Sequence, residues 1–272
     1  MCPNCRAFIT TDDRVCPYCG IKLGAKAVDR RSPSDLAGGL IPANRFTTTM
    51  ILLINIALYA ACNLFSMRHF GSGFLNIDGQ TLLAFGAKDR FLILVGGEYW
   101  RLITAGFLHG GIFHILMNSW ALTYVGAQVE ELYGSSRYIV IYFVATVLGF
   151  AASVFWSPAI SVGASAGLFG LIGAMIALSL GSDSSMARAV RGHYVQWAIY
   201  GIVLGLLPGF HIDNAAHIGG LAGGFGVAYI AGTPLLVEHL RDKMIRVAAG
   251  FCLLLTALAF AILILRFALA AA

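Results

Sequence analysis

Apolar residues in this chain form long uncharged blocks, and charged residues gather between the blocks. A helix needs about 20 residues to cross the hydrocarbon core of a bilayer. Measured against that length, the blocks predict seven membrane-spanning helices, near residues 47–66, 113–132, 137–157, 162–182, 193–209, 213–231 and 246–268. The fifth and sixth are short, and Pro208-Gly209 breaks the chain between them. The sequence therefore predicts an all-α polytopic membrane protein.

The composition agrees with a membrane protein. Of the 272 residues, 58% are hydrophobic and 11% are charged, whereas a soluble domain carries about 25% charged residues. The net charge of +5 does not indicate nucleic-acid binding, because the placement of the basic residues explains it. If the N-terminus is cytoplasmic, 13 Lys and Arg residues lie on the inner side and 5 on the outer side. The positive-inside rule then favours a cytoplasmic N-terminus and an external C-terminus.

The polar N-terminal region has two parts. Residues 1–22 carry four cysteines, and residues 23–45 read as a flexible basic linker whose Lys and Arg side chains we expect to touch anionic lipid head groups. The region lacks the apolar core of a signal peptide. The small loops and compact layout favour the inner (plasma) membrane of a bacterium.

The four cysteines form two C-x2-C pairs, Cys2 with Cys5 and Cys16 with Cys19. Four thiolates suit tetrahedral Zn²⁺ at a closed, structural site, so we expect a zinc ribbon. Two disulfides or a redox C-x-x-C pair are the alternatives. Disulfides are disfavoured in the cytoplasm, and a duplicated motif is unusual for redox chemistry. So small a module could hardly fold without its metal, and we expect it to dock a cytoplasmic protein partner.

Cys62 and Cys252 are single cysteines in apolar helices. We expect both to be small core residues.

Polar residues in the predicted helices mark candidate chemistry, because burying them in a bilayer is costly. His114 and Asn118 are four residues apart and share one face of the second helix. Two hydrogen-bond donors on one face can hold a developing oxyanion. Polar contacts between helices are the alternative interpretation of this pair.

Ser165 and His217 are the candidates for covalent chemistry. Ser165 stands between Gly163 and Gly167 near the start of an uncharged helix, whose free N–H groups can face an anion. A serine that only packs against another helix is the alternative. His217 precedes overlapping G-x-x-x-G spacings that allow close helix packing. A neutral histidine beside Ser165 would be a general base, whereas a metal ligand or a buried polar histidine are the alternatives.

Taken together, these stretches resemble the rhomboid family of intramembrane serine proteases. The residues that carry the resemblance are 98–101, 109–118, 130, 163–170 and 216–220. The resemblance covers roughly residues 46–231 and implies a six-helix catalytic core. The seventh helix, within residues 232–272, matches a six-plus-one arrangement, and the zinc ribbon lies outside the resemblance.

The resemblance also implies roles for single residues. Ser165 matches the nucleophile and His217 the base, and His114, Asn118 and the Ser165 N–H match the oxyanion hole. Further positions match neighbours of that site: Trp100 and Arg101 in the long first loop, His109 near the water-accessible cavity, and Phe169 packed on the catalytic histidine.

Three positions need separate interpretation. Ala166 departs from the family's usual G-x-S-G, and its methyl group could crowd the oxyanion. Asp213, four residues before His217, invites a Ser-His-Asp triad, but aspartate is favoured as a helix N-cap, so we expect a dyad. Glu130 is expected to be a structural hydrogen-bond partner near the inner end of the second helix.

The sequence therefore predicts an intramembrane serine endopeptidase that cleaves transmembrane segments of membrane proteins through an acyl-enzyme, without a catalytic cofactor. A catalytically inactive rhomboid-like protein that binds transmembrane helices is the alternative; the presence of both Ser165 and His217 argues against it. A metal-responsive transporter would need carboxylates inside the bundle, and the third, fourth, fifth and seventh predicted helices have none.

Overall fold

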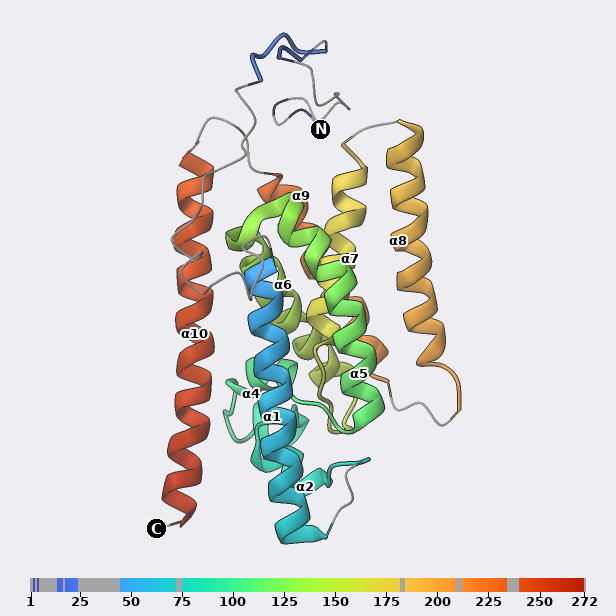
Figure 1. Ribbon diagram of the computed structural model, residues 1–272. Helices are drawn as coiled ribbons and strands as arrows, with labels where there is room; N and C mark the ends of the chain where they lie inside the picture. The colour runs from blue at the N-terminus through green and yellow to red at the C-terminus, as the bar shows by residue number, and fades with distance from the viewer. Residues whose placement is uncertain are drawn as a thin grey trace.

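The computed structural model describes residues 2, 4, 14–16, 18–23, 45–71, 75–181, 184–208, 212–233 and 240–271. From residue 45 onwards the described chain is mostly helical, and its extended segments meet only in isolated bridges (Figure 1). The predicted all-α membrane fold is therefore confirmed. Of the linker predicted at 23–45, all residues but the two ends lie outside the described part of the chain.

Long helices alternate with short helices in the loops. The bounds are α1 Phe46–Phe70, α2 Gly79–Ala84, α3 Arg90–Leu94, α4 Arg101–Thr104, η3 Ala105–Phe107, α5 Ile112–Ala121, η4 Leu122–Gly126, α6 Ala127–Trp156, α7 Ser165–Ser179, α8 Ser185–Leu204, α9 Asn214–Ala231 and α10 Leu240–Ala271. Among the described residues, three helical runs have the length and apolar composition to cross a membrane: Phe46–Phe70, Ile112–Trp156 and Leu240–Leu269.

Gly134 divides the longest of these runs into two helices. Its φ of 75° and ψ of 160° are not helical, and glycine adopts a positive φ without the steric cost that other residues incur. Tyr138, just after the break, lies against Gly126, before it. The chain therefore turns back at Gly134, as the predicted division into helices near 113–132 and 137–157 requires.

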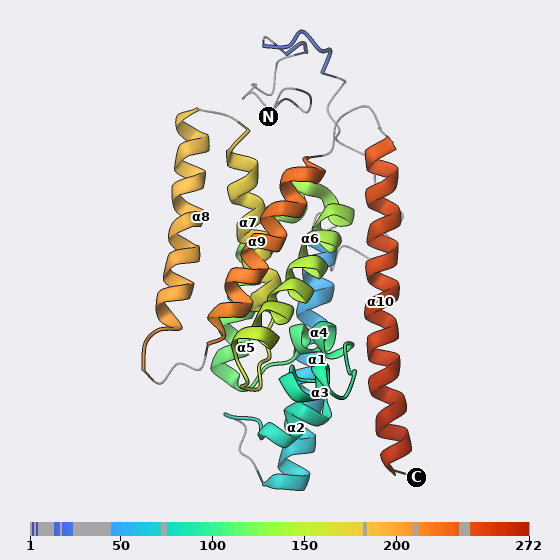
Figure 2. The same ribbon diagram turned by 180° about the vertical axis from the view of Figure 1, so that it is seen from behind.

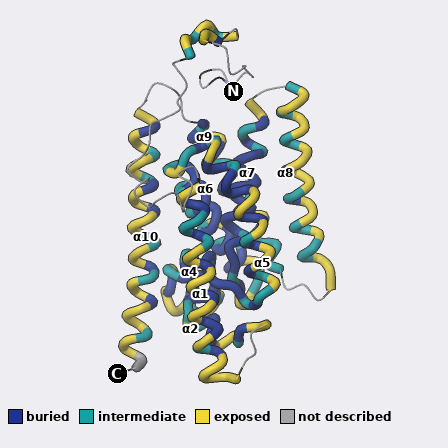
Figure 3. Tube along the Cα trace, viewed as in Figure 1, coloured by how far each residue is buried: buried dark blue, intermediate teal, exposed yellow. Residues whose placement is uncertain are grey.

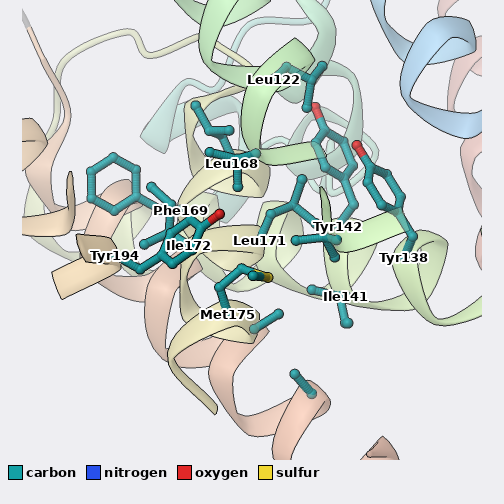
Figure 4. Packing of buried hydrophobic residues seen from close by; sticks show 14 of the residues in the cluster. Leu122, Tyr138, Ile141, Tyr142, Leu168, Phe169, Leu171, Ile172, Met175 and Tyr194 are labelled. Carbon is teal, nitrogen blue, oxygen red and sulfur yellow. The ribbon is translucent and has the colours of Figure 1, made fainter. Parts of the chain in front are cut away.

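Helix α7 forms the centre of the bundle (Figure 3). It packs against α6, α8 and α9, and most of its side chains are buried. Leu168, Leu171 and Ile172 belong to the same buried cluster as Ile141 and Tyr142 of α6 (Figure 4). An uncharged helix with apolar residues on every side is the pattern expected for such a central position.

Helices α8 and α10 flank the bundle on opposite sides (Figures 1 and 2). The predicted fifth helix, 193–209, was wrong at both ends, because α8 begins at Ser185 and ends at Leu204. The Ser184 side chain accepts a hydrogen bond from the N–H of Ala187 and so starts the helix earlier. Arginines close to that start do not end a membrane helix, because their long side chains can extend to the membrane surface.

Helix α10 also begins earlier than the predicted residue 246. Asp242 in its first turn forms a buried ion pair with Arg137 of α6. A charge that is paired in this way can lie inside the protein at the start of an apolar helix.

Candidate active site

Ser165 is the first residue of α7 and is half-buried. The preceding Gly163 has a φ of 136°, a backbone conformation that side chains other than glycine rarely adopt. A Cβ atom added at Gly163 would lie 2.7 Å from His114 Nε2 and 3.4 Å from Ser165 Oγ. His114 and Ser165 therefore border the same small space, and the helix start turns its free N–H groups towards that end.

The loop before Ser165 is held by the first loop of the molecule. Lys88 exchanges backbone hydrogen bonds with Ser161 at 3.0 and 3.1 Å. Its buried ammonium group donates to the carbonyl oxygens of Ser157 at 2.6 Å and Ala159 at 3.0 Å. These contacts fix the chain just upstream of the proposed nucleophile.

Nothing in the sequence singles out Lys88, because its partners lie about 70 residues further along the chain. Burial lowers the pKa of its ammonium group below the ordinary value, and the carboxylates of Asp213 and Asp89 partly oppose that shift. Lys88 is in the loop between α2 and α3, outside the membrane-spanning helices.

Asn118 and His114 lie one turn apart on α5, as their spacing predicts. The Asn118 side-chain amide donates to the His114 carbonyl oxygen at 3.0 Å. The ring of His109 stands edge-on to that of His114, with centroids 5.0 Å apart. Both His109 ring nitrogens are buried without a hydrogen-bond partner among the described residues. His114 thus lies next to the start of α7 with His109 beside it, and Asn118 lies one turn further along α5.

His217 lies in the first turn of α9, and its ring stacks on Phe169 of α7, with centroids 4.0 Å apart and planes at 16°. The predicted packing of Phe169 on this histidine is confirmed. The interpretation of Asp213 as an N-cap is confirmed too, because its carboxylate accepts the N–H of Ala216 at 3.0 Å and the hydroxyl of Ser153. Within the described chain, His217 Nδ1 has no hydrogen-bond partner. A Ser-His-Asp triad therefore has no support.

Glycines bring α9 against α7 and α6. A Cβ atom added at Gly149 of α6 would lie 2.6 Å from the Ala216 carbonyl oxygen and 2.8 Å from Ala166 Cβ. Ala216 and Ala166 are the chain neighbours of His217 and Ser165, so the two candidate residues lie on facing helices at the same level. No hydrogen bond joins their side chains in the described part of the chain. Such bonds are often long in a free enzyme and shorten with substrate.

Glu130 has the structural role expected of it. One carboxylate oxygen accepts the N–H of Thr47 at 2.8 Å and the hydroxyl of Ser135 at 2.9 Å. The other accepts the N–H of Thr48 at 2.9 Å and its hydroxyl at 2.8 Å. Glu130 therefore caps the start of α1 from another helix.

Three of the four predicted zinc ligands come together. The sulfur atoms of Cys2, Cys16 and Cys19 all lie within 4.8 Å of one another, and those of Cys2 and Cys19 are 3.6 Å apart. Tetrahedral zinc with bonds of about 2.3 Å separates its sulfur ligands by about 3.8 Å, so the three thiolates fit that metal. No disulfide joins the described cysteines. The fourth predicted ligand, Cys5, lies outside the described residues.

A short hairpin places two of these ligands. Val15 pairs with Lys22, and the N–H of Gly20 donates to the Cys16 carbonyl oxygen at 2.9 Å. Gly20 has a φ of 70°, so the chain turns sharply after Cys19. Cys62 and Cys252 are buried in α1 and α10, as expected of core residues.

The fold and the site define an integral membrane protein with a helical core, a serine at a helix start and a cysteine-rich head. The Rhomboid domain family matches residues 96–234, about half of the chain, and a zinc-ribbon domain matches residues 1–23. The chain belongs to the rhomboid family.

Several relatives are named as proteases or rhomboid-like proteins. "Rhomboid protease GluP" of Bacillus subtilis (strain 168) is 42% identical over 155 residues, which are 57% of this chain and 30% of that protein. "Rhomboid-like protease 2" of Toxoplasma gondii is 39% identical over 149 residues, 54% of this chain and 52% of that protein. "RHOMBOID-like protein 1" of Arabidopsis thaliana is 37% identical over 159 residues, which are 57% of this chain and 40% of that protein. The chain thus spans about half or less of these relatives.

Proposed function

We propose that this protein is an intramembrane serine endopeptidase with a Ser165–His217 dyad. The observation that carries the proposal is the close packing of α9 on α7. This packing turns His217, which stacks on Phe169, towards the start of α7 at Ser165. Membership of the rhomboid family and the names of its relatives support the same reading.

In the proposed reaction, the Ser165 oxygen attacks a peptide carbonyl carbon and its proton moves to His217. The carbonyl oxygen becomes an oxyanion, held by the Ser165 N–H, Asn118 and His114. His217 then gives the proton to the leaving amine as the peptide bond breaks, and an acyl-enzyme remains. Water, deprotonated by His217, releases the acyl group and restores Ser165.

The substrates we propose are transmembrane segments of other membrane proteins. A helix hides its carbonyl groups in its own hydrogen bonds, so the segment must unwind before Ser165 can attack. Small or helix-breaking residues near the outer boundary of the membrane favour that unwinding. Water for the second step enters from the outer side, since the bilayer core holds none.

We also propose a cytoplasmic N-terminus and an external C-terminus, on the distribution of basic residues. The small loops and compact layout favour a bacterial inner membrane. Cys2, Cys5, Cys16 and Cys19 are the proposed ligands of a structural zinc ion. The ribbon is the proposed docking site for a cytoplasmic protein, and no cofactor takes part in the cleavage.

The test is labelling of the purified, detergent-solubilised protein with a fluorescent fluorophosphonate, which needs no knowledge of the substrate. We expect label on the wild type and none on Ser165→Ala or His217→Ala. Ser179→Ala, at the other end of α7, is the matched control and should label like the wild type. A well-folded wild type without label would favour the inactive protein that binds transmembrane helices.

The proposed role of His217 as base also predicts a pH dependence. Protonated imidazole cannot accept the Ser165 proton, so the labelling rate should fall as the pH is lowered. The rate is measured in one detergent between about pH 3 and 8, a range that covers the titration of exposed and of buried histidines. A flat profile over that whole range, in protein that stays folded, would contradict the assignment of His217.

A further inference from the structure

The outer end of α10 is attached to the first loop. The guanidinium group of Arg266 pairs with the carboxylate of Glu98, although 168 residues separate them in the chain. The adjoining Phe267 packs edge-on against Phe65 of α1 at 5.9 Å and Phe85 at 4.9 Å. In Figures 1 and 2 this end of α10 lies at the same end of the bundle as α2.

Glu98 is shared by two arginines. One carboxylate oxygen takes Arg266, and the other accepts Arg101 Nε at 2.5 Å. The Glu98 side chain is only 9% exposed, so removal of either cation leaves a buried carboxylate with less compensation. Both guanidinium groups also lie over the Trp100 ring, at 4.6 Å for Arg101 and 5.8 Å for Arg266.

Polar contacts continue from Arg101 towards Ser165. Arg101 donates to the carbonyl oxygens of Leu83 at 2.7 Å and Ala87 at 3.1 Å. Lys88, which follows Ala87 in the chain, forms hydrogen bonds with the loop 157–161 through its backbone and its ammonium group. That loop leads directly into Ser165. Ion pairs, hydrogen bonds and the short chain segments between them therefore join the last helix to the segment that carries the proposed nucleophile.

We propose that Arg266 is a positioning residue of this protease, which holds Glu98 and Arg101 so that the loop before Ser165 keeps its productive conformation. The inference rests on the proposed function. It gives α10 a task in the reaction, although α10 lies outside the residues 96–234 that match the family. Coupling of this kind is transmitted through contiguous packed and hydrogen-bonded groups.

The test compares fluorophosphonate labelling rates of the full-length wild type, Arg266→Ala and Arg266→Lys at a temperature where all three are folded. We expect Arg266→Ala to label about 3- to 30-fold more slowly, the range typical of residues along a coupling route. Arg266→Lys keeps the charge near Glu98 and should recover most of the rate. Arg241→Ala removes an exposed basic residue in the first turn of α10 and is the matched control.

Two results would overturn the inference. One is a wild-type rate for Arg266→Ala, even if its melting temperature falls, because that describes a purely structural contact. The other is an Arg266→Lys variant that stays as slow as Arg266→Ala. If the wild type shows no label that depends on Ser165, both the proposed function and the positioning role of Arg266 are contradicted. If only the positioning role is wrong, the wild type still labels at Ser165.

Amide hydrogen exchange provides a readout that needs no activity. In Arg266→Ala, peptides that cover residues 84–101 and 157–164 should exchange faster. The backbone hydrogen bonds between Lys88 and Ser161 would open more often in this variant. Residues 165–179 of α7 should keep their protection. Unchanged exchange over 157–164 would overturn the proposed route.

Discussion

The methyl group of Ala166 faces a helix interface. Ala166 is fully buried and clusters with Phe150 and Ala216, and its Cβ lies next to Gly149. The space shared by His114 and Ser165 lies instead at Gly163. The departure from the family's usual glycine therefore adds a packing contact between α7 and α6, and the geometry gives no sign that it obstructs the oxyanion.

Ala166→Gly should keep the fluorophosphonate labelling rate within about twofold of the wild type. It should lower the free energy of unfolding by about 1–2 kcal/mol, because a buried methyl group is lost and the backbone becomes freer. Labelling kinetics and thermal unfolding in the same detergent measure both quantities. A tenfold faster rate would mean that the methyl group does crowd the site.

At this scale, the sequence predicts well what depends on neighbours in the chain. The N-cap at Asp213 and the shared face of His114 and Asn118 follow from local spacing, and both are confirmed. The contacts of Lys88 and Arg266 could not be predicted, because their partners lie far away in the sequence and meet them only in the folded protein. The roles of Ser165 and His217 in catalysis stay predictions.

Among the helices, the approach of α9 to α7 depends on the absence of side chains. A Cβ atom added at Gly220 would overlap the Ala166 carbonyl group, whereas one added at Gly226 on the same helix would meet no atom within 4 Å. These two glycines therefore form a matched pair for substitution.

Gly220→Ala should force α9 away from α7 and move His217 from Ser165. We expect labelling to fall at least tenfold, since about 1 Å of misplacement can cost 10²-fold in rate. Gly226→Ala should label normally and be slightly more stable, because alanine is the better helix former. Equal labelling of the two variants would contradict the importance of the close α7–α9 contact.

The capping of α1 by Glu130 allows a second matched comparison. Glu130→Gln replaces one acceptor oxygen by an amide group and leaves N–H or hydroxyl donors at Thr47, Thr48 or Ser135 without a partner. The free energy of unfolding should fall by about 1–3 kcal/mol. Glu131→Gln alters an exposed neighbour and should change it by less than about 0.5 kcal/mol. Thermal unfolding of both variants is the measurement, and equal stability would contradict the cap.

Helix ends are harder to predict than helix positions. All seven apolar blocks became helices, since length and apolar composition decide that. The starts of α8 and α10 are earlier than predicted, because the basic residues Arg188 and Arg241 are typical of loops under the positive-inside rule. Asp242 is tolerated in α10 by its ion pair with Arg137, which lies in a different part of the sequence.

For the molecule as a whole, the proposed zinc site in the cysteine head is separate from the proposed active site in the helical core. We expect the purified protein to contain about one zinc ion per chain, because four thiolates fill a tetrahedral site. A strong chelator or Cys16→Ser should remove the metal, whereas Cys252→Ser, in α10, should retain it. Metal analysis of each sample measures this.

Loss of the metal should leave fluorophosphonate labelling within about twofold of the wild type, because no residue of the proposed active site is among the ligands. Slower labelling of the metal-free protein would instead connect the ribbon to catalysis. Zinc retained by Cys16→Ser would contradict the ligand set.

The contact between Glu130 and α1 also has a consequence for biogenesis. Glu130 is synthesised 82 residues after Thr48, so the first span emerges from the ribosome long before the carboxylate that caps its N-terminal end. The amides of Thr47 and Thr48 must meanwhile be satisfied by water or lipid head groups. The N-terminal cap of the first span is therefore completed only when the second span inserts beside it. Because of this order of synthesis, the second span fixes the position of the first.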